Sequence, residues 1–253
     1  MNLEVEGRRF LIVGGSRGLG RAVAETLAHE GALTVVTSRG FKEAQDAARC
    51  LPKCQGMALD TGDQESIGNF IKAWGHAPLD GIFVNTGGPR PGEFFDLTPE
   101  DWMRAFSQLV YGPAQLVKDL APNLVDGGSL LFNTSSSIRV PIAHLFLSNV
   151  LRPAVEALAK GLSFELAARR IRTNVIAPGR IATDRVEELD QAAASRNRQS
   201  IEFIRQQAQA AIPLGRYGLP EEFGRTAAFL LSPAASYISG ISLFVDGGQT
   251  KAL

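Results

Sequence analysis

A glycine-rich segment with the sequence VGGSRGLG, residues 13–20, directly follows the apolar run RFLI and opens the first segment with helical periodicity. Gly14, Gly18 and Gly20 permit a tight turn in which backbone N–H groups come close to a pyrophosphate. The N-terminus of the following helix adds its partial positive charge at the same place. A strand, a glycine turn and a helix in this order predict a dinucleotide-binding α/β fold.

Strand and helix patterns alternate along the rest of the chain. Segments with helical periodicity separate seven apolar, β-rich runs: RFLIVGG, LTVVTS, GMALD, DGIFVNTGG, GSLLFNTSS, IRTNVIAPG and ISLFVDGG. Such alternation with short connections is typical of a parallel sheet that helices cover on both faces. We therefore predict a single Rossmann-type α/β domain over residues 1–253. Its doubly wound parallel sheet should have about seven strands and a ligand site beyond their carboxyl ends.

Residues 184–212 depart from this alternation. They are polar, have helical character and lie between a strand and the last helix, without a Pro/Gly linker that would separate them as a domain. Because this helical insertion leaves a strand at its carboxyl end, we expect one of two roles. It forms either a lid over the substrate or a surface helix pair that serves packing or subunit contacts.

The overall composition argues against several classes of protein. The 253 residues are 45% hydrophobic and carry a formal net charge of zero without a dense basic tract, which argues against nucleic-acid binding. The first residues, MNLEVEGRRF, contain no apolar signal-peptide core, and no apolar run approaches the roughly 20 residues that span a bilayer. Cys50, Cys54 and three scattered histidines lack metal-site spacing. We predict a cytoplasmic protein without nucleic-acid, membrane or metal partners.

The end of the second strand indicates which dinucleotide binds. A site for NAD presents an acidic residue there to the 2′-hydroxyl of the ribose. This chain instead has Thr37, Ser38 and Arg39, with Arg17 inside the glycine turn. Two guanidinium groups and a hydroxyl suit a 2′-phosphate, which arginine binds in bidentate fashion. We therefore predict NADP(H) in preference to NAD(H), and the missing acid also disfavours a methyltransferase.

The chain resembles the short-chain dehydrogenase/reductase family, and within it the 3-oxoacyl-carrier-protein reductase branch, over nearly its whole length. The resemblance rests on GGSRGLG, with Gly14 in place of the family's usual threonine, on LDTGD, NTGG, FNTSSSI and NVIAPGRIAT, and on the C-terminal helix and strand. It implies an enzyme that acts on a small-molecule substrate and forms a homo-oligomer, a tetramer or a dimer. The positions expected to bind the cofactor are Gly14, Ser16, Arg17, Gly18, Leu19, Gly20, Ser38, Arg39, Asp60, Thr61, Asn85, Thr86, Gly87, Pro178, Gly179, Ile181 and Thr183.

The catalytic positions depart from the family pattern. In the family an asparagine, a serine, a tyrosine and a lysine act together on a substrate carbonyl. The resemblance places Leu109 at the asparagine and Ser136 at the serine. It places Ser148 at the tyrosine and Arg152 at the lysine. Three of the four chemical groups are therefore changed.

A one-residue deletion before Pro141 leaves this register open. Depending on where the deletion lies, the family's serine corresponds to Ser136 or to Ser135. If the deletion lies elsewhere, Asn149 rather than Ser148 approaches the place of the tyrosine.

The substituted groups differ in their acid–base chemistry. A phenol has a pKa near 10 that an adjacent lysine lowers, whereas a serine hydroxyl is a far weaker acid that needs a neighbouring base. Arginine does not exchange protons near neutral pH, but it holds a fixed charge and donates several hydrogen bonds. We predict that Ser136 orients the substrate oxygen, and that Arg152 holds the cofactor and polarises the carbonyl. Ser148 would donate a hydrogen bond or position a water molecule.

Pro113, four residues after Leu109, predicts a disturbed helix. Proline lacks the N–H group that would bond the Leu109 carbonyl oxygen. In the family this helix is disturbed at the asparagine, whose main-chain carbonyl holds a water molecule of the proton relay. We predict that the disturbance and the water site persist here, with a kink that serves only packing as the alternative.

Four arginines follow predicted strand ends on the ligand side: Arg90, Arg139, Arg180 and Arg185. Their clustering predicts an anionic substrate, such as a carboxylate or a phosphopantetheine-linked acyl group. Two functions remain open. One is an NADPH-dependent carbonyl reductase, or a dehydrogenase in reverse, with a rebuilt proton-donating site. The other is a non-catalytic NADP-binding protein with a sensing or assembly role.

Overall fold

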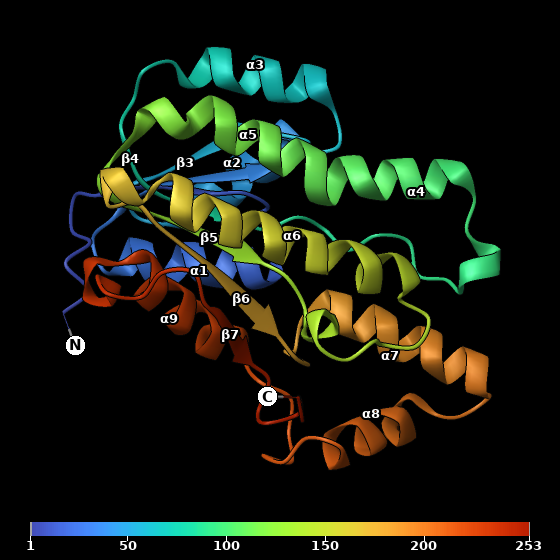
Figure 1. The fold of residues 1–253 in the computed structure, drawn as a ribbon. Helices are drawn as coiled ribbons and strands as arrows, with labels where there is room; N and C mark the ends of the chain where they lie inside the picture. Colours follow the sequence, from blue (N-terminus) through green and yellow to red (C-terminus); the bar gives the residue numbers. More distant parts are fainter. Residues whose placement is uncertain (1, 253) are drawn as a thin grey trace.

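The computed structural model describes residues 2–252 and contains one sheet of seven parallel strands with helices on both faces (Figure 1). The strands are β1 (Arg9–Ile12), β2 (Leu33–Ser38), β3 (Cys54–Ala58), β4 (Leu79–Val84), β5 (Leu124–Asn133), β6 (Arg172–Pro178) and β7 (Ser242–Val245). Their order is β3-β2-β1-β4-β5-β6-β7, and every neighbouring pair is parallel. The predicted fold class, a Rossmann-type doubly wound α/β sheet, is confirmed.

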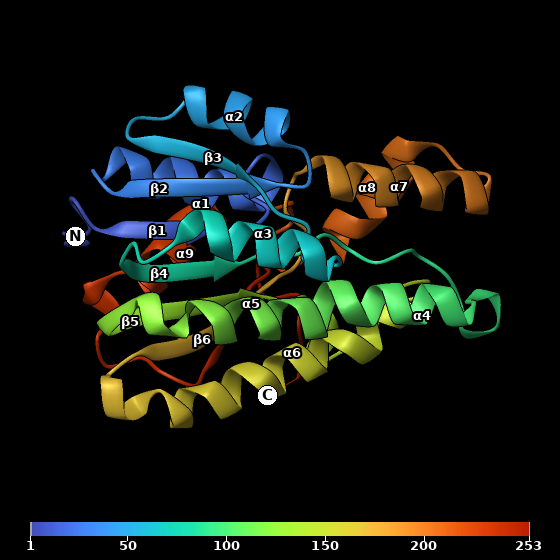
Figure 2. The ribbon, with the colours of Figure 1, turned by 90° about the horizontal axis from the view of Figure 1, so that it is seen from above.

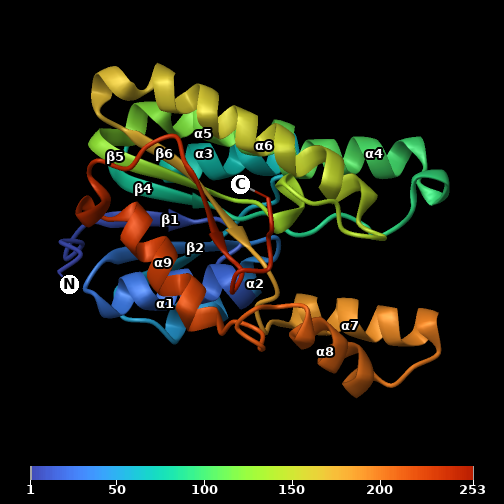
Figure 3. The same cartoon turned by 60° about the horizontal axis from the view of Figure 1, so that its bottom comes forward.

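Two apolar cores lie on the two faces of the sheet (Figures 1 and 3). One face is covered by α3 (Gln64–Trp74), α5 (Gly112–Leu120) and α6 (Phe146–Glu165), the other by α1 (Gly18–His29), α2 (Phe41–Arg49) and α9 (Pro220–Leu231). Side chains alternate along a strand, so Leu11 of β1 enters the first core and Phe10 and Ile12 enter the second. Burial on both faces explains why the strand segments are nearly continuous apolar runs.

The strand order reverses between β1 and β4. The two strands stay paired to their carboxyl ends, where the N–H of Val13 donates to the carbonyl oxygen of Phe83 at 2.9 Å. The connections that leave such neighbouring strands diverge to opposite faces of the sheet. The ligand site that the sequence predicts beyond the carboxyl ends of the strands therefore corresponds to the point where β1 and β4 end side by side.

Two helical regions extend past the carboxyl ends of the strands (Figure 2). One is α4 (Pro99–Phe106), which continues through a π-helical turn, Ser107–Tyr111, into α5. The other is the pair α7 (Asp184–Asn197) and α8 (Ile201–Ala210), which follows β6. None of the helices within residues 2–252 is both long enough and apolar enough to cross a membrane.

The π-helical turn packs directly against the loop that follows β3. A Cβ atom at Gly112 would lie only 1.7 Å from the carbonyl oxygen of Thr61. The Thr61 hydroxyl in turn donates to the carbonyl oxygen of Gln108 at 3.1 Å. Glycine at position 112 therefore allows this backbone approach.

We expect Gly112→Ala to lower the free energy of unfolding by about 1–3 kcal/mol, because the added methyl group forces the two backbones apart. Gly68→Ala in α3 is the matched control. Apart from the adjoining residues and the backbone of the same helix, no atom lies within 4 Å of the Cβ position at Gly68, so alanine there should raise stability by up to about 1 kcal/mol through helix propensity. Urea unfolding measures the free energy of unfolding of both variants. Equal values for Gly112→Ala and Gly68→Ala would contradict the close packing at Gly112.

Candidate active site

The glycine turn leaves no room for side chains. A Cβ atom at Gly14 would lie 2.4 Å from the carbonyl oxygen of Asn85, and one at Gly20 would lie 2.1 Å from the carbonyl oxygen of Gly14. Gly14 and Gly18 also adopt left-handed backbone conformations, with φ of +64° and +56°. Arg17 occupies the N-cap of α1 without a side-chain hydrogen bond to the helix. The first N–H groups of α1 are therefore free of a side-chain cap and suit an anion.

A line of hydrogen bonds runs from the glycine turn to α6. The Nδ2 of Asn85 donates to the carbonyl oxygen of Gly14 at 3.1 Å, and the Nδ2 of Asn133 donates to the Oδ1 of Asn85 at 2.7 Å. The carbonyl oxygen of Asn133 then accepts from the Nη1 of Arg152 at 2.8 Å. Sequence reasoning did not identify Asn133, although a buried amide at the end of the apolar run SLLFN is a usable signal.

The residues predicted for the adenosine end of the cofactor lie in the turn after β1 and at the ends of β2 and β3. Arg17 and Arg39 are exposed, and within residues 2–252 neither forms an ion pair with a carboxylate. Ser38 is the last residue of β2 and directly precedes Arg39 in the sequence. The Oδ1 of Asp60 accepts the N–H of Gly62 at 2.8 Å, which shapes the loop after β3.

The segment 178–183 lies opposite the glycine turn. The Cγ2 of Thr183 is 3.8 Å from the position that a Cβ atom of Gly18 would take. Gly179 allows a second close approach, because its Cβ position is 2.5 Å from the Cβ of Asp246. The structure therefore brings the residues predicted for the cofactor from five strand ends to one edge of the sheet, around Gly14–Gly20, Ser38 and Arg39, Asp60 and Thr61, Asn85–Gly87 and Pro178–Thr183.

Ser148 lies on the buried face of α6, with 6% of its surface exposed. Its Oγ is 3.4 Å from the Oγ of Ser137, and this weak contact leaves both hydroxyls able to bind another oxygen. Ser135 accepts the N–H of Ser137 and caps the short 3₁₀ turn, while Ser136 is half-buried at the start of that turn. Sequence reasoning considered Ser135 and Ser136 but missed Ser137.

Asn149, the alternative to Ser148, is engaged elsewhere. Its Oδ1 accepts the N–H of Ile142 at 3.0 Å, and its Nδ2 donates to the carbonyl oxygen of Ile142 at 2.9 Å. This pair of bonds holds the loop that precedes α6. The side-chain amide of Asn149 is thus occupied by the loop backbone.

Arg152 is buried, with 5% of its surface exposed, and it contacts only uncharged oxygens. Besides the Asn133 carbonyl, Nη1 reaches the hydroxyl of Thr86 and Nη2 reaches the carbonyl oxygen of Thr86, both at 3.4 Å. Its Nε has no partner among the described residues. Burial and, to a smaller degree, the charge of Arg185 lower the pKa of Arg152 to about 10, so the guanidinium remains charged at neutral pH.

Leu109 is fully buried beside Leu147 and Leu151 and offers no polar side chain to a substrate. The predicted disturbance of its helix is present as the π-helical turn, in which the N–H of Gly112 donates to the carbonyl oxygen of Ser107. Such turns interrupt the regular helical ladder and often occur at functional sites. The predicted water at the Leu109 carbonyl stays a prediction.

The four arginines that follow strand ends do not form a free cationic cluster. Each binds a carboxylate of this chain: Arg90 binds Asp101, Arg139 binds Glu156, Arg180 binds Asp190 and Arg185 binds Glu188. Arg90, Arg139 and Arg180 are held in close pairs and therefore do not indicate an anionic substrate, whereas the pair of Arg185 is longer, at 3.4 Å.

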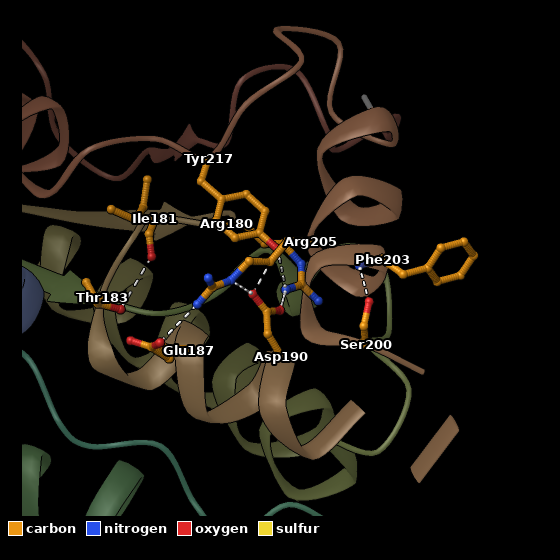
Figure 4. Close-up of polar contacts among 9 residues, drawn as sticks. All are labelled: Arg180, Ile181, Thr183, Glu187, Asp190, Ser200, Phe203, Arg205 and Tyr217. Atoms are coloured by element: carbon orange, nitrogen blue, oxygen red, sulfur yellow. Dashed lines mark hydrogen bonds and ion pairs between the residues drawn. The ribbon is translucent and has the colours of Figure 1, made fainter. Parts of the chain in front are cut away.

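Asp190 ties the insertion to the rest of the molecule (Figure 4). Its fully buried side chain points from α7 toward Arg180, which follows β6, and toward Arg205 of α8. The hydroxyl of Tyr217 donates to its Oδ2 at 3.0 Å, and burial raises the pKa of Tyr217, so the phenol keeps its proton. Arg205 also binds Glu187 at 3.0 Å. This network anchors α7 and α8 to the strand end.

Comparison with known proteins gives one family over almost the whole chain. A family model described as enoyl-(acyl carrier protein) reductase matches residues 13–250. The curated relatives include the NADPH-dependent reductase BacG of Bacillus subtilis, with 28% identity over 97% of this chain and 99% of the relative. Carbonyl reductase family member 4 of Danio rerio is 30% identical over 95% of this chain and 97% of its own length.

Solved structures agree with this match. L-sorbose reductase from Gluconobacter frateurii, in complex with NADPH and L-sorbose, superimposes with a TM-score of 0.94 at 27% identity, over all of both chains. The 3-oxoacyl-[acyl-carrier-protein] reductase FabG of Aquifex aeolicus is a further curated relative, 28% identical over 98% of this chain and all of its own length.

We expect Asp190→Asn to lower the free energy of unfolding by roughly 2–4 kcal/mol, because it leaves the guanidinium groups of Arg180 and Arg205 without their buried charge partner. Hydrogen exchange of the amides in α7 and α8 should accelerate as well. Glu188→Gln is the matched control on the same helix. It removes only an exposed pair at 3.4 Å, so stability should change by less than about 1 kcal/mol. Unchanged exchange in Asp190→Asn would contradict the anchoring role.

Proposed function

The chain belongs to the short-chain dehydrogenase/reductase family, and we propose that it is an NADP(H)-dependent oxidoreductase that reduces the carbonyl group of a small molecule or oxidises the corresponding alcohol. One observation carries the proposal. The charged, buried guanidinium of Arg152 and the hydroxyls of Ser137 and Ser148 lie at the carboxyl edge that also holds the glycine turn. Relatives named as NADPH-dependent or carbonyl reductases support it.

The residues present fit NADP(H). Gly14 and Gly20 exclude Cβ atoms from the turn, and the first turn of α1 has no side-chain cap that would compete with a pyrophosphate. Arg17 and Arg39 would hold the 2′-phosphate, because both are exposed and no carboxylate within the described range engages them. When bound, the cofactor supplies the hydride.

Ser137 and Ser148 would hold the oxygen of the substrate carbonyl. Two hydroxyls that lie 3.4 Å apart can each turn a hydrogen toward one acceptor placed between them. Ser136, the serine predicted from the sequence, is the alternative donor, since it begins the 3₁₀ turn that also contains Ser137.

Arg152 would stabilise the negative charge that develops on this oxygen. A preorganised cation in a desolvated site is worth more than one in water, and it needs no reorganisation during the reaction. Because the pKa of Arg152 is about 10, the guanidinium supplies charge rather than a proton at neutral pH. The proton then reaches the oxygen from water, with the serine hydroxyls able to pass one proton on as they receive another.

We also propose that the protein is a homo-oligomer, a dimer or a tetramer. Met103, Phe106 and Tyr111 are each more than 40% exposed on α4 and the π-helical turn. Several large apolar side chains on one helical segment support a surface that another subunit covers.

Steady-state oxidation of NADPH with a panel of aldehydes and ketones tests the enzymatic proposal. The native protein should turn over at least one substrate. Arg152→Gln should lower kcat/KM by about 100-fold or more, because it removes a preorganised charge next to the developing oxyanion. Ser148→Ala should lower it by about tenfold or more. Arg90→Gln, which removes an arginine paired with Asp101 at the surface, is the control and should change kcat/KM by less than about twofold.

The double variant Ser148→Tyr, Arg152→Lys restores the family's acid and lysine. Turnover in this double variant but not in the native protein would show that the native site does not reduce these carbonyls. Turnover in the native protein that survives Arg152→Gln would contradict the role given to Arg152.

A further inference from the structure

We propose that Arg152 and Arg185 together bind a carboxylate of the substrate, so that the protein acts on small carbonyl compounds with a carboxylate close to the carbonyl group, of which 2-oxo acids are the simplest class. This inference rests on the proposed function for the identity of the reacting carbonyl. The anion site itself rests on the side chains of this chain.

A second buried arginine shows how a purely structural guanidinium is accommodated in this protein. Arg172 is 7% exposed and donates to the carbonyl oxygens of Leu230, Leu231 and Ser232 at 2.7, 3.3 and 2.9 Å. These carbonyls end α9, where the helix dipole is negative, so the positive charge is compensated.

Arg152 has no such compensation. One of its contacts is 2.8 Å long, the other two are 3.4 Å long, and its buried Nε donates to nothing in the part of the chain that the structure describes. No carboxylate among residues 2–252 forms an ion pair with it. A buried charge without a counter-charge is costly, and a bound anion would remove that cost.

Arg185 brings a second positive charge toward the same place. It lies in the first turn of α7 and reaches across to the loop after β4, where its Nη2 donates to the carbonyl oxygen of Pro89 at 3.2 Å. The same Nη2 lies 3.0 Å from the position that a Cβ atom of Gly88 would take. Its ion pair with Glu188 is 3.4 Å long and exposed on both sides, so it neutralises Arg185 only weakly.

Both guanidinium groups contact the segment that follows β4: Arg152 donates to the carbonyl oxygen of Thr86, and Arg185 donates to the carbonyl oxygen of Pro89. The charge of Arg185 is the only other charge that shifts the pKa of Arg152 among the groups described. An anion between them would be attracted by both and would offer the Nε of Arg152 an acceptor. The chemistry of the pair is therefore that of a carboxylate site.

The depth of Arg152 distinguishes this substrate class from carrier-linked acyl groups. Arg152 lies one helical turn after Ser148 on the same buried face of α6, so the anion and the carbonyl oxygen are only a few bonds apart. The phosphate of a long carrier arm would instead need a cation at the surface. Arg90, Arg139 and Arg180 cannot serve readily, because each is held by a carboxylate.

Isothermal titration with oxamate and with oxamide tests the proposal. The two probes have the same shape, but oxamate carries a carboxylate where oxamide carries a neutral amide. With saturating NADP⁺, the native protein should bind oxamate at least about 30-fold more tightly than oxamide, as expected for a charge-assisted contact in a buried site. Arg152→Gln should bring this ratio close to one, and Arg185→Gln should lower it several-fold.

Arg90→Gln is the control and should keep the full preference for oxamate, because it removes one positive charge from the same side of the sheet but not from this site. Circular dichroism verifies the fold of each variant. If Arg152→Gln does not fold, the titration of Arg185→Gln tests the proposal in its place, because the side chain of Arg185 is partly exposed and its replacement should leave the fold intact. Equal binding of oxamate and oxamide by the native protein would overturn the proposal, as would an oxamate preference that both Arg152→Gln and Arg185→Gln retain.

The same protein samples separate this inference from the proposed function. Reduction of neutral ketones without an oxamate preference would overturn the carboxylate site and leave the oxidoreductase intact. The titrations are repeated without the nucleotide. If the preference for oxamate over oxamide still depends on Arg152, it supports the carboxylate site even in a protein that oxidises no NADPH.

Discussion

The hydrogen bonds from Gly14 through Asn85 and Asn133 to Arg152 hold the ligand edge of this molecule together. They cross from β1 to β4 to β5 and end on α6, so the glycine turn and the guanidinium are fixed with respect to each other. Amide groups suit this role because each offers both a donor and an acceptor. The placement of the cofactor cradle and of the reacting groups depends on this line of contacts.

The site that results is cationic and does not titrate near neutral pH. In the proposed mechanism serine hydroxyls stand where the family has a phenol and Arg152 stands where it has a lysine, so hydrogen bonding and fixed charge would take the place of a side-chain acid. In that mechanism a charge that is present throughout the reaction would stabilise the developing oxyanion and would leave protonation to water. The missing counter-charge at Arg152 is also the observation behind the proposed carboxylate site, because an uncompensated buried cation suits an anionic partner.

Sequence patterns predicted the fold well, because strand and helix periodicities report burial on both faces of the sheet. Pro113 predicted the disturbed helix, since a missing N–H group disrupts any helix. Which of three consecutive serines meets Ser148 could not be predicted, because the 3₁₀ turn at Ser136–Ile138 decides it. The partners of the surface arginines were missed for a similar reason. Arg139 meets Glu156 only after α6 packs beside it, and charge clusters in a sequence do not show such pairings.

The pH dependence of kcat/KM for carbonyl reduction tests the central claim, that a fixed charge has replaced a titrating acid. A tyrosine–lysine site loses activity as pH rises through the pKa of its acid. For the native protein the account predicts a profile that is flat within about twofold from pH 6 to 9, because this range lies below the pKa of about 10 to which burial lowers Arg152. A falling limb with an apparent pKa between 6 and 9 that persists in Arg152→Gln would contradict it, because it would require a side-chain acid that the account does not contain.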